Sequence, residues 1–96
     1  MDIELGQIRN IIEKVSGLNI GTKYRKRERV LARSLYYFFA KKYTNNTNEA
    51  IGKIVNRSHC SVLHMITQYH EYYSFQDYTV KLRANCEKMI AKIIKK

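Results

Sequence analysis

The sequence predicts an all-α fold, a compact bundle of about five helices that contains a helix-turn-helix. The 96 residues include no proline and only four glycines, so few positions interrupt a helix. Long stretches rich in Ile, Leu, Lys, Tyr and Glu repeat their apolar residues at helical spacing, and the alternation typical of strands is missing. The length fits a single domain over residues 1–96. Its last helix, from about 77 to 96, carries a longer apolar stripe than one small domain needs and is a candidate interaction element.

The first predicted helix covers about residues 3–16 and ends at Gly17. Its apolar face consists of Ile8, Ile11, Ile12 and Val15. A short connector, residues 18–22, then leads into a basic run at 23–27. We therefore expect this helix to serve as scaffold and the basic run to form a loop.

The second predicted helix runs from about residue 27 to residue 43. At 100° per residue, one side gathers Val30, Leu31, Leu35 and Phe38. The opposite side gathers Lys26, Arg29, Arg33 and Tyr37. We expect one side to face the core and the other to be cationic.

The helix-turn-helix is predicted from the spacing of the next two helices. The polar residues 44–48 break the chain, and residues 48–55 then give about two helical turns. Asn56 can take the left-handed conformation that ends a helix, and Ser58 can cap the next one. This leaves a turn of about three residues, which is helix-turn-helix spacing.

The following helix, about residues 59–73, is expected to bury Val62, Ile66, Tyr69 and Tyr73. Its other side presents Cys60, Ser61, His64, Thr67 and Gln68. This side is polar and almost uncharged, so it suits hydrogen bonds to base edges better than plain solvation. Residues 74–77 resemble a capping box with Ser74 as the cap, and the last helix follows.

The charge of the chain indicates a polyanionic partner. The net charge is +10, and it gathers in two segments. Residues 22–43 hold eight basic side chains against one Glu, and residues 80–96 hold six against one Glu. Two separate basic segments favour a phosphate-contacting surface, and solubility alone is the plainer alternative.

Several classes of protein are not expected. No apolar run is long enough to span a bilayer and the acidic start is unlike a secretory signal, so we expect a cytoplasmic protein that does not bind membranes. The two cysteines lack zinc-ribbon spacing; a metal site built from His59, Cys60, His64 and Cys86 is an unfavoured alternative. No catalytic group or Gly-rich phosphate loop is visible, so we expect no enzyme, no cofactor and no small-molecule substrate.

The stretch IGKIVNRSHCSVLH, with KYRKRERVLARS upstream, resembles the C-terminal DNA-binding domain (domain IV) of the bacterial replication initiator DnaA, a helix-turn-helix of the Trp-repressor-like type. The matching residues in the first stretch are Ile51, Gly52, Val55, Asn56, Arg57, His59, Ser61, Val62 and Leu63. The ATPase of that initiator is not expected here, because its phosphate-loop motif is missing. The start at Met1 and the basic end suit a free-standing protein of a bacterium or phage, and an excised domain is the alternative.

The resemblance implies that a basic loop holds phosphates, that Arg33 enters the minor groove, and that the start of the second motif helix reads bases in the major groove. Base readout is assigned to Arg33, Arg57, Ser58, His59, Cys60, Ser61 and His64. Phosphate contact is assigned to Lys23, Tyr24, Arg25, Lys26, Arg27, Arg29, Lys53, Thr67 and Gln68. Ser58 and Cys60 stand where the family usually has Asp and Thr, so a different preferred DNA sequence is expected.

The predicted function is sequence-specific binding of double-stranded DNA in replication control or transcription regulation. The main alternative is a protein–protein interaction module, a homodimer or a partner of a replication protein, with only non-specific DNA affinity. A membrane-surface role for the Lys-rich end is a third. At single residues, Arg33 could be a solvated surface arginine, and His59 could pack inside the protein.

Overall fold

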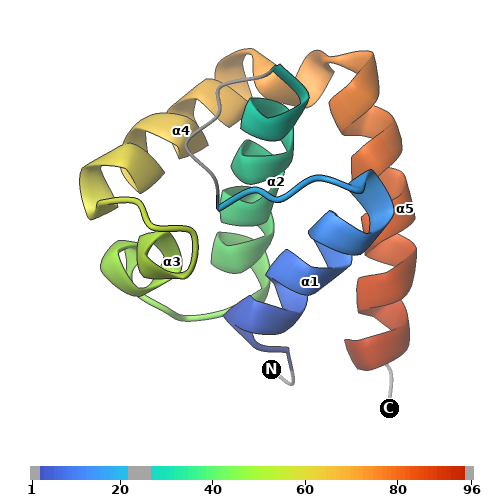
Figure 1. The fold of residues 1–96 in the computed structure, drawn as a ribbon, viewed down its shortest axis with the longest axis horizontal. Coiled ribbons are helices and arrows are strands. Elements are labelled where there is room, and N and C mark those ends of the chain that lie inside the picture. Colours follow the sequence, from blue (N-terminus) through green and yellow to red (C-terminus); the bar gives the residue numbers. More distant parts are fainter. Residues whose placement is uncertain (1–2, 22–26, 95–96) are drawn as a thin grey trace.

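The computed structural model describes residues 3–21 and 27–94 (Figure 1). Within these ranges the chain forms five α-helices and one short 3-10 helix, and no strand. The elements are α1 (Leu5–Ser16), α2 (Arg27–Tyr43), α3 (Asn48–Ile54), α4 (His59–Glu71), η1 (Tyr73–Phe75) and α5 (Asp77–Ile94). The all-helical prediction is confirmed. None of the described helices has the length and apolar character to cross a bilayer.

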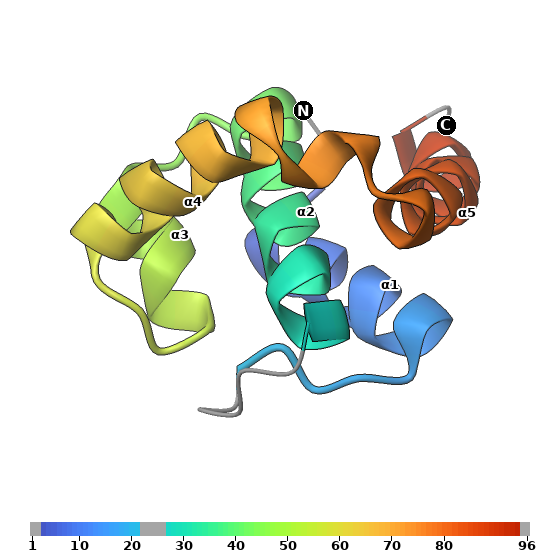
Figure 2. The same ribbon diagram turned by 90° about the horizontal axis from the view of Figure 1, so that it is seen from above.

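Helix α2 lies at the centre of the molecule. The pair α1 and α5 packs on one side of it, and the pair α3 and α4 packs on the other (Figures 1 and 2). As a result, every residue of α2 from Leu31 to Ala40 is buried except Phe38, which is partly exposed. The prediction that only one side of α2 faces the core is wrong: Arg33 and Tyr37, on the predicted cationic side, are buried as well, because α4 and the connector before α2 cover that side.

Local capping residues set the ends of α1 and α3. Gly17 ends α1 as predicted, with φ at 73° and its N–H donating to the Glu13 carbonyl at 2.8 Å. Thr47 begins α3, since its hydroxyl accepts a hydrogen bond from the Ala50 N–H at 3.1 Å. These caps satisfy backbone groups that the helix itself leaves unpaired.

The predicted turn between α3 and α4 is confirmed. Asn56 has φ at 58°, in the left-handed region, and Ser58 accepts from the Ser61 N–H at 3.3 Å. The predicted capping box at 74–77 is wrong. Ser74 lies inside η1, and α5 begins only at Asp77, because the 3-10 turn uses the residues that the box would need.

One side chain links the two sides of the molecule directly. Arg9 of α1 pairs with Glu13 on its own helix at 3.1 Å, and its Nη1 donates to the Ile54 carbonyl at the end of α3 at 2.5 Å. The Ile54 carbonyl lies at the end of the helix, where carbonyl groups have no hydrogen-bond partner within the helix. This link holds the helix-turn-helix in position against α1.

Candidate nucleic-acid interface

The turn of the helix-turn-helix folds tightly back onto α3. The Gly52 carbonyl accepts from the Arg57 N–H at 2.8 Å and from the Val55 N–H at 3.0 Å. A Cβ atom at position 52 would lie 2.5 Å from the Arg57 carbonyl oxygen and 3.0 Å from Cγ2 of Val62. Only glycine fits this approach, so Gly52 sets the position of α4 relative to α3.

The outward side of α4 is largely the predicted one. Val62 and Tyr69 are buried, and Ile66 and Tyr73 are partly buried against the core. The exposed residues from the cap to the middle of the helix are Ser58, His59, Cys60, Leu63, His64 and Thr67, with Ser61 and Gln68 half-buried. His59 is exposed, so the alternative that it packs inside the protein is wrong.

Leu63 is the member of this face that was not assigned a role from the sequence. It matches the family pattern but is 52% exposed, between Cys60 and Thr67 on the outward side. Helical spacing could have placed Leu63 on this face, because residues three or four apart in a helix share one face, and Leu63 lies three residues after Cys60 and four before Thr67. An exposed leucine among polar side chains can make apolar contact with a thymine methyl group.

The first turn of α4 presents a short polar cluster. The Ser58 hydroxyl caps the helix and lies 3.3 Å from the Ser61 hydroxyl. The His59 ring nitrogen Nε2 lies 3.5 Å from the Cys60 sulfur. Hydroxyl, imidazole and thiol groups therefore cluster at the end of α4 that projects from the molecule (Figure 1).

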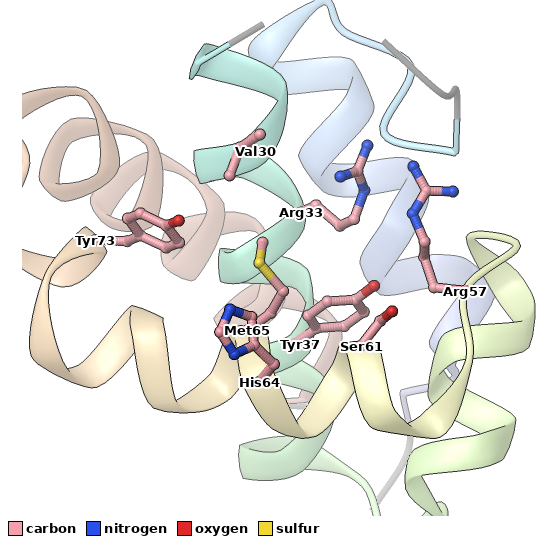
Figure 3. Close-up of a pocket in the computed structure, with 8 residues that line it drawn as sticks. All are labelled: Val30, Arg33, Tyr37, Arg57, Ser61, His64, Met65 and Tyr73. Atoms are coloured by element: carbon pink, nitrogen blue, oxygen red, sulfur yellow. The ribbon is translucent and has the colours of Figure 1, made fainter. Parts of the chain in front are cut away.

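A pocket of about 510 Å³ lies between α2 and α4 (Figure 3). Its walls are formed by Val30, Arg33, Tyr37, Arg57, Ser61, His64, Met65 and Tyr73. Arg33 is only 6% exposed, and its Nε donates to the Ile20 carbonyl at 2.9 Å. The alternative of a solvated surface arginine is therefore wrong, and an open minor-groove probe would have to leave this position.

A second hollow, of about 550 Å³, lies at the outer end of the helix-turn-helix. It is lined by Glu49, Lys53, Asn56, Arg57, Ser58 and His59. Arg57 borders both hollows, and its Nη1 donates to the carbonyls of Val55 and Asn56 at 3.3 and 3.2 Å. These bonds hold the guanidinium over the turn, where it can serve either hollow.

Tyr37 lies fully buried at the wall of the first pocket. Burial raises the pKa of its hydroxyl, and the positive charges of Arg33 and Arg57 partly oppose this rise. The two arginines are thus near enough to Tyr37 for their charge to act on it. Helical spacing predicted that Arg33 and Tyr37 share one side of α2, but no local pattern in the sequence placed Arg57 beside them.

The sequence of residues 8–68 matches the family of the bacterial DnaA protein helix-turn-helix. This chain belongs to that family. The match covers more than half of the chain, from the second turn of α1 to near the end of α4. Searches among curated proteins and solved structures gave no significant match.

Membership in the DnaA helix-turn-helix family suggests DNA binding, and the family is not a catalytic one. The hollows bring together most of the residues assigned to base readout, with only Cys60 lining neither. Among the residues assigned to phosphate that the structure describes, only Lys53 lines a hollow. Arg27, Lys53 and Thr67 are exposed, whereas Arg29 and Gln68 are half-buried. Lys23, Tyr24, Arg25 and Lys26 lie outside the described residues.

The unfavoured metal site is not assembled in this DnaA-type fold. Within residues 3–21 and 27–94, no three His, Cys, Asp or Glu side chains are grouped so that they could hold a metal ion. Cys60 is exposed on α4, whereas Cys86 is buried in the core from α5. Burial raises the pKa of the Cys86 thiol to about 12, so this sulfur stays protonated and unreactive.

Proposed function

We propose that the protein binds double-stranded DNA in a sequence-specific manner, with α4 in the major groove, and that it acts in replication control or transcription regulation. The observation that carries the proposal is the outward face of α4, which is exposed, polar and free of acidic side chains until Glu71. Such a face can approach the DNA without repelling phosphates and can still hydrogen-bond base edges.

In this proposal the residues divide by their place on α4. Ser58 and His59 at its first turn meet base edges, while Leu63 and Cys60 meet thymine methyl groups. Lys53 borders the outer hollow and holds a phosphate beside the groove, and Arg57, which the sequence assigned to base readout, borders the same hollow from the turn. The basic residues at the start of α2 add further phosphate contacts.

In this proposal Arg33 contacts the minor groove only if its side chain leaves its buried position. Its side chain is 6% exposed and bonded to the Ile20 carbonyl, so entry into the groove would exchange that bond for a contact with DNA. A narrow A·T-rich groove of negative potential would favour the exchange. Arg33→Ala should therefore lower both the thermal stability and the specific affinity.

The deciding experiment is selection of bound sequences from a random duplex pool. We expect an enriched motif of several base pairs, different from the standard DnaA box, because Ser58 and Cys60 replace the usual Asp and Thr. Recovery of the standard box as the tightest site would contradict the altered preference. Failure to enrich any motif would contradict sequence-specific binding.

A thiol footprint tests the orientation of α4 on the selected duplex. Cys60 is exposed on the outward face of α4, and Cys86 is buried in the core. Saturating DNA should slow alkylation of Cys60 severalfold, with Cys86 as the internal control. If the protein–DNA complex forms but Cys60 is alkylated as fast as in the free protein, the DNA must bind to a face other than the outward face of α4.

A second candidate function is contact with another copy of the chain through the region around η1 and the start of α5. The observation that favours it is the exposure of three large side chains there: Tyr72 at 56%, Phe75 at 75% and Val80 at 50%. Sedimentation with and without DNA, for the wild type and Phe75→Ser, tests it. A monomer at all concentrations, bound to DNA one to one, would exclude the dimer.

A further inference from the structure

The side chain of Tyr37 is buried without the hydrogen bond that a buried hydroxyl needs. It is 0% exposed, and its hydroxyl has no partner among the described residues. A buried polar group without a partner costs free energy, because it has lost its water and gained nothing in return. Figure 3 shows the hydroxyl directed toward the side of the pocket where Arg33, Arg57 and Ser61 lie.

The neighbouring tyrosine shows that this is not a general property of α2. Tyr36 is also 0% exposed, yet its hydroxyl donates to the Ile51 carbonyl at 2.8 Å. The two rings are adjacent, with centroids 5.5 Å apart. The Tyr69 and Thr79 hydroxyls are also buried without a partner among the described residues, but only the Tyr37 hydroxyl belongs to a residue that lines the pocket. We therefore expect its partner in the pocket.

The lining of the pocket is suited to an anion. Two arginines border it, Ser61 and His64 add polar groups from α4, and none of the lining residues that the structure describes is acidic. A guanidinium offers several N–H donors in one plane and matches the oxygens of a phosphate group. The pocket volume of about 510 Å³ leaves room for a phosphate with an attached sugar.

We propose that this pocket binds one phosphate group, which accepts a hydrogen bond from the Tyr37 hydroxyl and is held by the charges of Arg33 and Arg57 (Figure 3). In this arrangement Arg33 keeps its bond to the Ile20 carbonyl and lines the pocket, so the arrangement is an alternative to entry of Arg33 into the minor groove. The phosphate can belong to the DNA backbone or be free in solution, since both present the same oxygens. A backbone phosphate deepens the proposed function and rests on it, because the pocket shares Ser61 and His64 with α4.

The test is Tyr37→Phe, which removes one oxygen atom and keeps the ring in the core. In the absence of ligand we expect equal or higher thermal stability, since the unpaired hydroxyl is lost. We expect the affinity for the selected duplex, or for inorganic phosphate, to fall about tenfold, because a hydrogen bond to a charged group is lost.

The matched control is Tyr36→Phe, one residue away. It removes the bond to the Ile51 carbonyl, so it should lower the melting temperature. Its affinity for DNA and for phosphate, measured well below that melting temperature, should equal the wild-type affinity. Tyr37→Phe should thus lower affinity without lowering stability, and Tyr36→Phe should lower stability without lowering affinity. A merely structural role of Tyr37 would not produce this difference.

Two measurements identify the source of the phosphate. For the backbone, a neutral methylphosphonate replaces one phosphate linkage of the duplex at a time. At one position this replacement should weaken DNA binding by the wild type about tenfold, but it should not weaken binding by Tyr37→Phe any further. For free phosphate, inorganic phosphate at matched ionic strength should raise the melting temperature of the wild type more than that of Tyr37→Phe, with no coupled linkage in the DNA.

Tyr37→Phe that binds both the duplex and inorganic phosphate as the wild type does would overturn the inference. An enriched DNA motif together with that result would leave the proposed function intact and remove only the phosphate pocket. If the wild type enriches no motif, the proposed function fails, and the inorganic phosphate measurement alone then decides the pocket.

Discussion

The helix pairs on the two sides of α2 differ in how they use their side chains (Figure 2). On one side, α1 buries Leu5, Ile8, Ile11 and Ile12, and α5 buries Thr79, Leu82, Cys86 and Ile90. On the other side, α4 buries only Val62 and Tyr69 along its 13 residues and exposes most of its polar groups. The comparison indicates that more of the apolar packing lies in α1 and α5, whereas the recognition that we propose lies in α3 and α4, so substitutions should separate the two properties.

The largest effect is expected in the scaffold. Ile12 is 0% exposed, and Ile12→Ala should lower the free energy of unfolding by about 2–5 kcal/mol, because it removes buried methyl groups and leaves a cavity. Denaturant unfolding measures this loss, and Val80→Ala, at an exposed site on α5, is the control. An altered preferred DNA motif in Ile12→Ala would break the separation of the two sides.

Gly52→Ala tests the junction between α3 and α4. The added Cβ would lie 2.5 Å from the Arg57 carbonyl oxygen, so the backbone of the turn must move. We expect a loss of about 1–3 kcal/mol in stability from overpacking, together with weaker specific binding. Thermal unfolding and DNA titration measure both.

Gly6→Ala is the matched glycine control. Nothing lies within 4 Å of a Cβ at Gly6, which is in the first turn of α1. Alanine there should raise stability by up to about 1 kcal/mol, because it is the better helix former. DNA binding should not change, and a loss of binding equal to that of Gly52→Ala would remove the special role of the turn.

An effect on DNA binding alone is expected on the outward face of α4. His64→Ala should weaken binding of the selected duplex by about 1–3 kcal/mol, with little change in melting temperature, because this side chain is exposed. His70→Ala is the control, since His70 is exposed on the same helix but packs edge-on against Phe38 and Tyr69. Equal losses for both variants would show that the histidines act only through general charge or helix stability.

The last effect is absent at neutral pH and concerns the buried thiol at high pH. The Cys86 pKa rises from 9.0 to about 12 on folding, so between these values the unfolded chain loses a proton that the folded chain keeps. Stability from this group is complete below pH 9 and is lost as the pH rises toward 12. Cys86→Ala should show a shallower decrease in the free energy of unfolding over this range. An unchanged slope would contradict the shift. Tyr36, Tyr37 and Tyr78, whose pKa values burial also raises, contribute to the slope that remains.

Much of the fold could be predicted because its signals are local. Apolar spacing located the five helices, Gly17 marked the end of α1, and Asn56 and Ser58 marked the turn before α4. The polar face of α4 followed from the same periodicity. The capping box predicted at Ser74 was wrong because the same short polar sequence can form either a capping box or a 3-10 turn.

The amino-acid sequence by itself determined the helical class, the helix-turn-helix, the basic charge and the family to which the chain belongs. Only the tertiary structure decided that Arg33 bonds to Ile20, that Gly52 lies against Arg57, and that Tyr37 is buried without a partner. Periodicity gives the two sides of a helix, but α2 is packed on both sides. Which polar groups end up buried there depends on contacts between residues far apart in the chain, and no local pattern encodes those contacts.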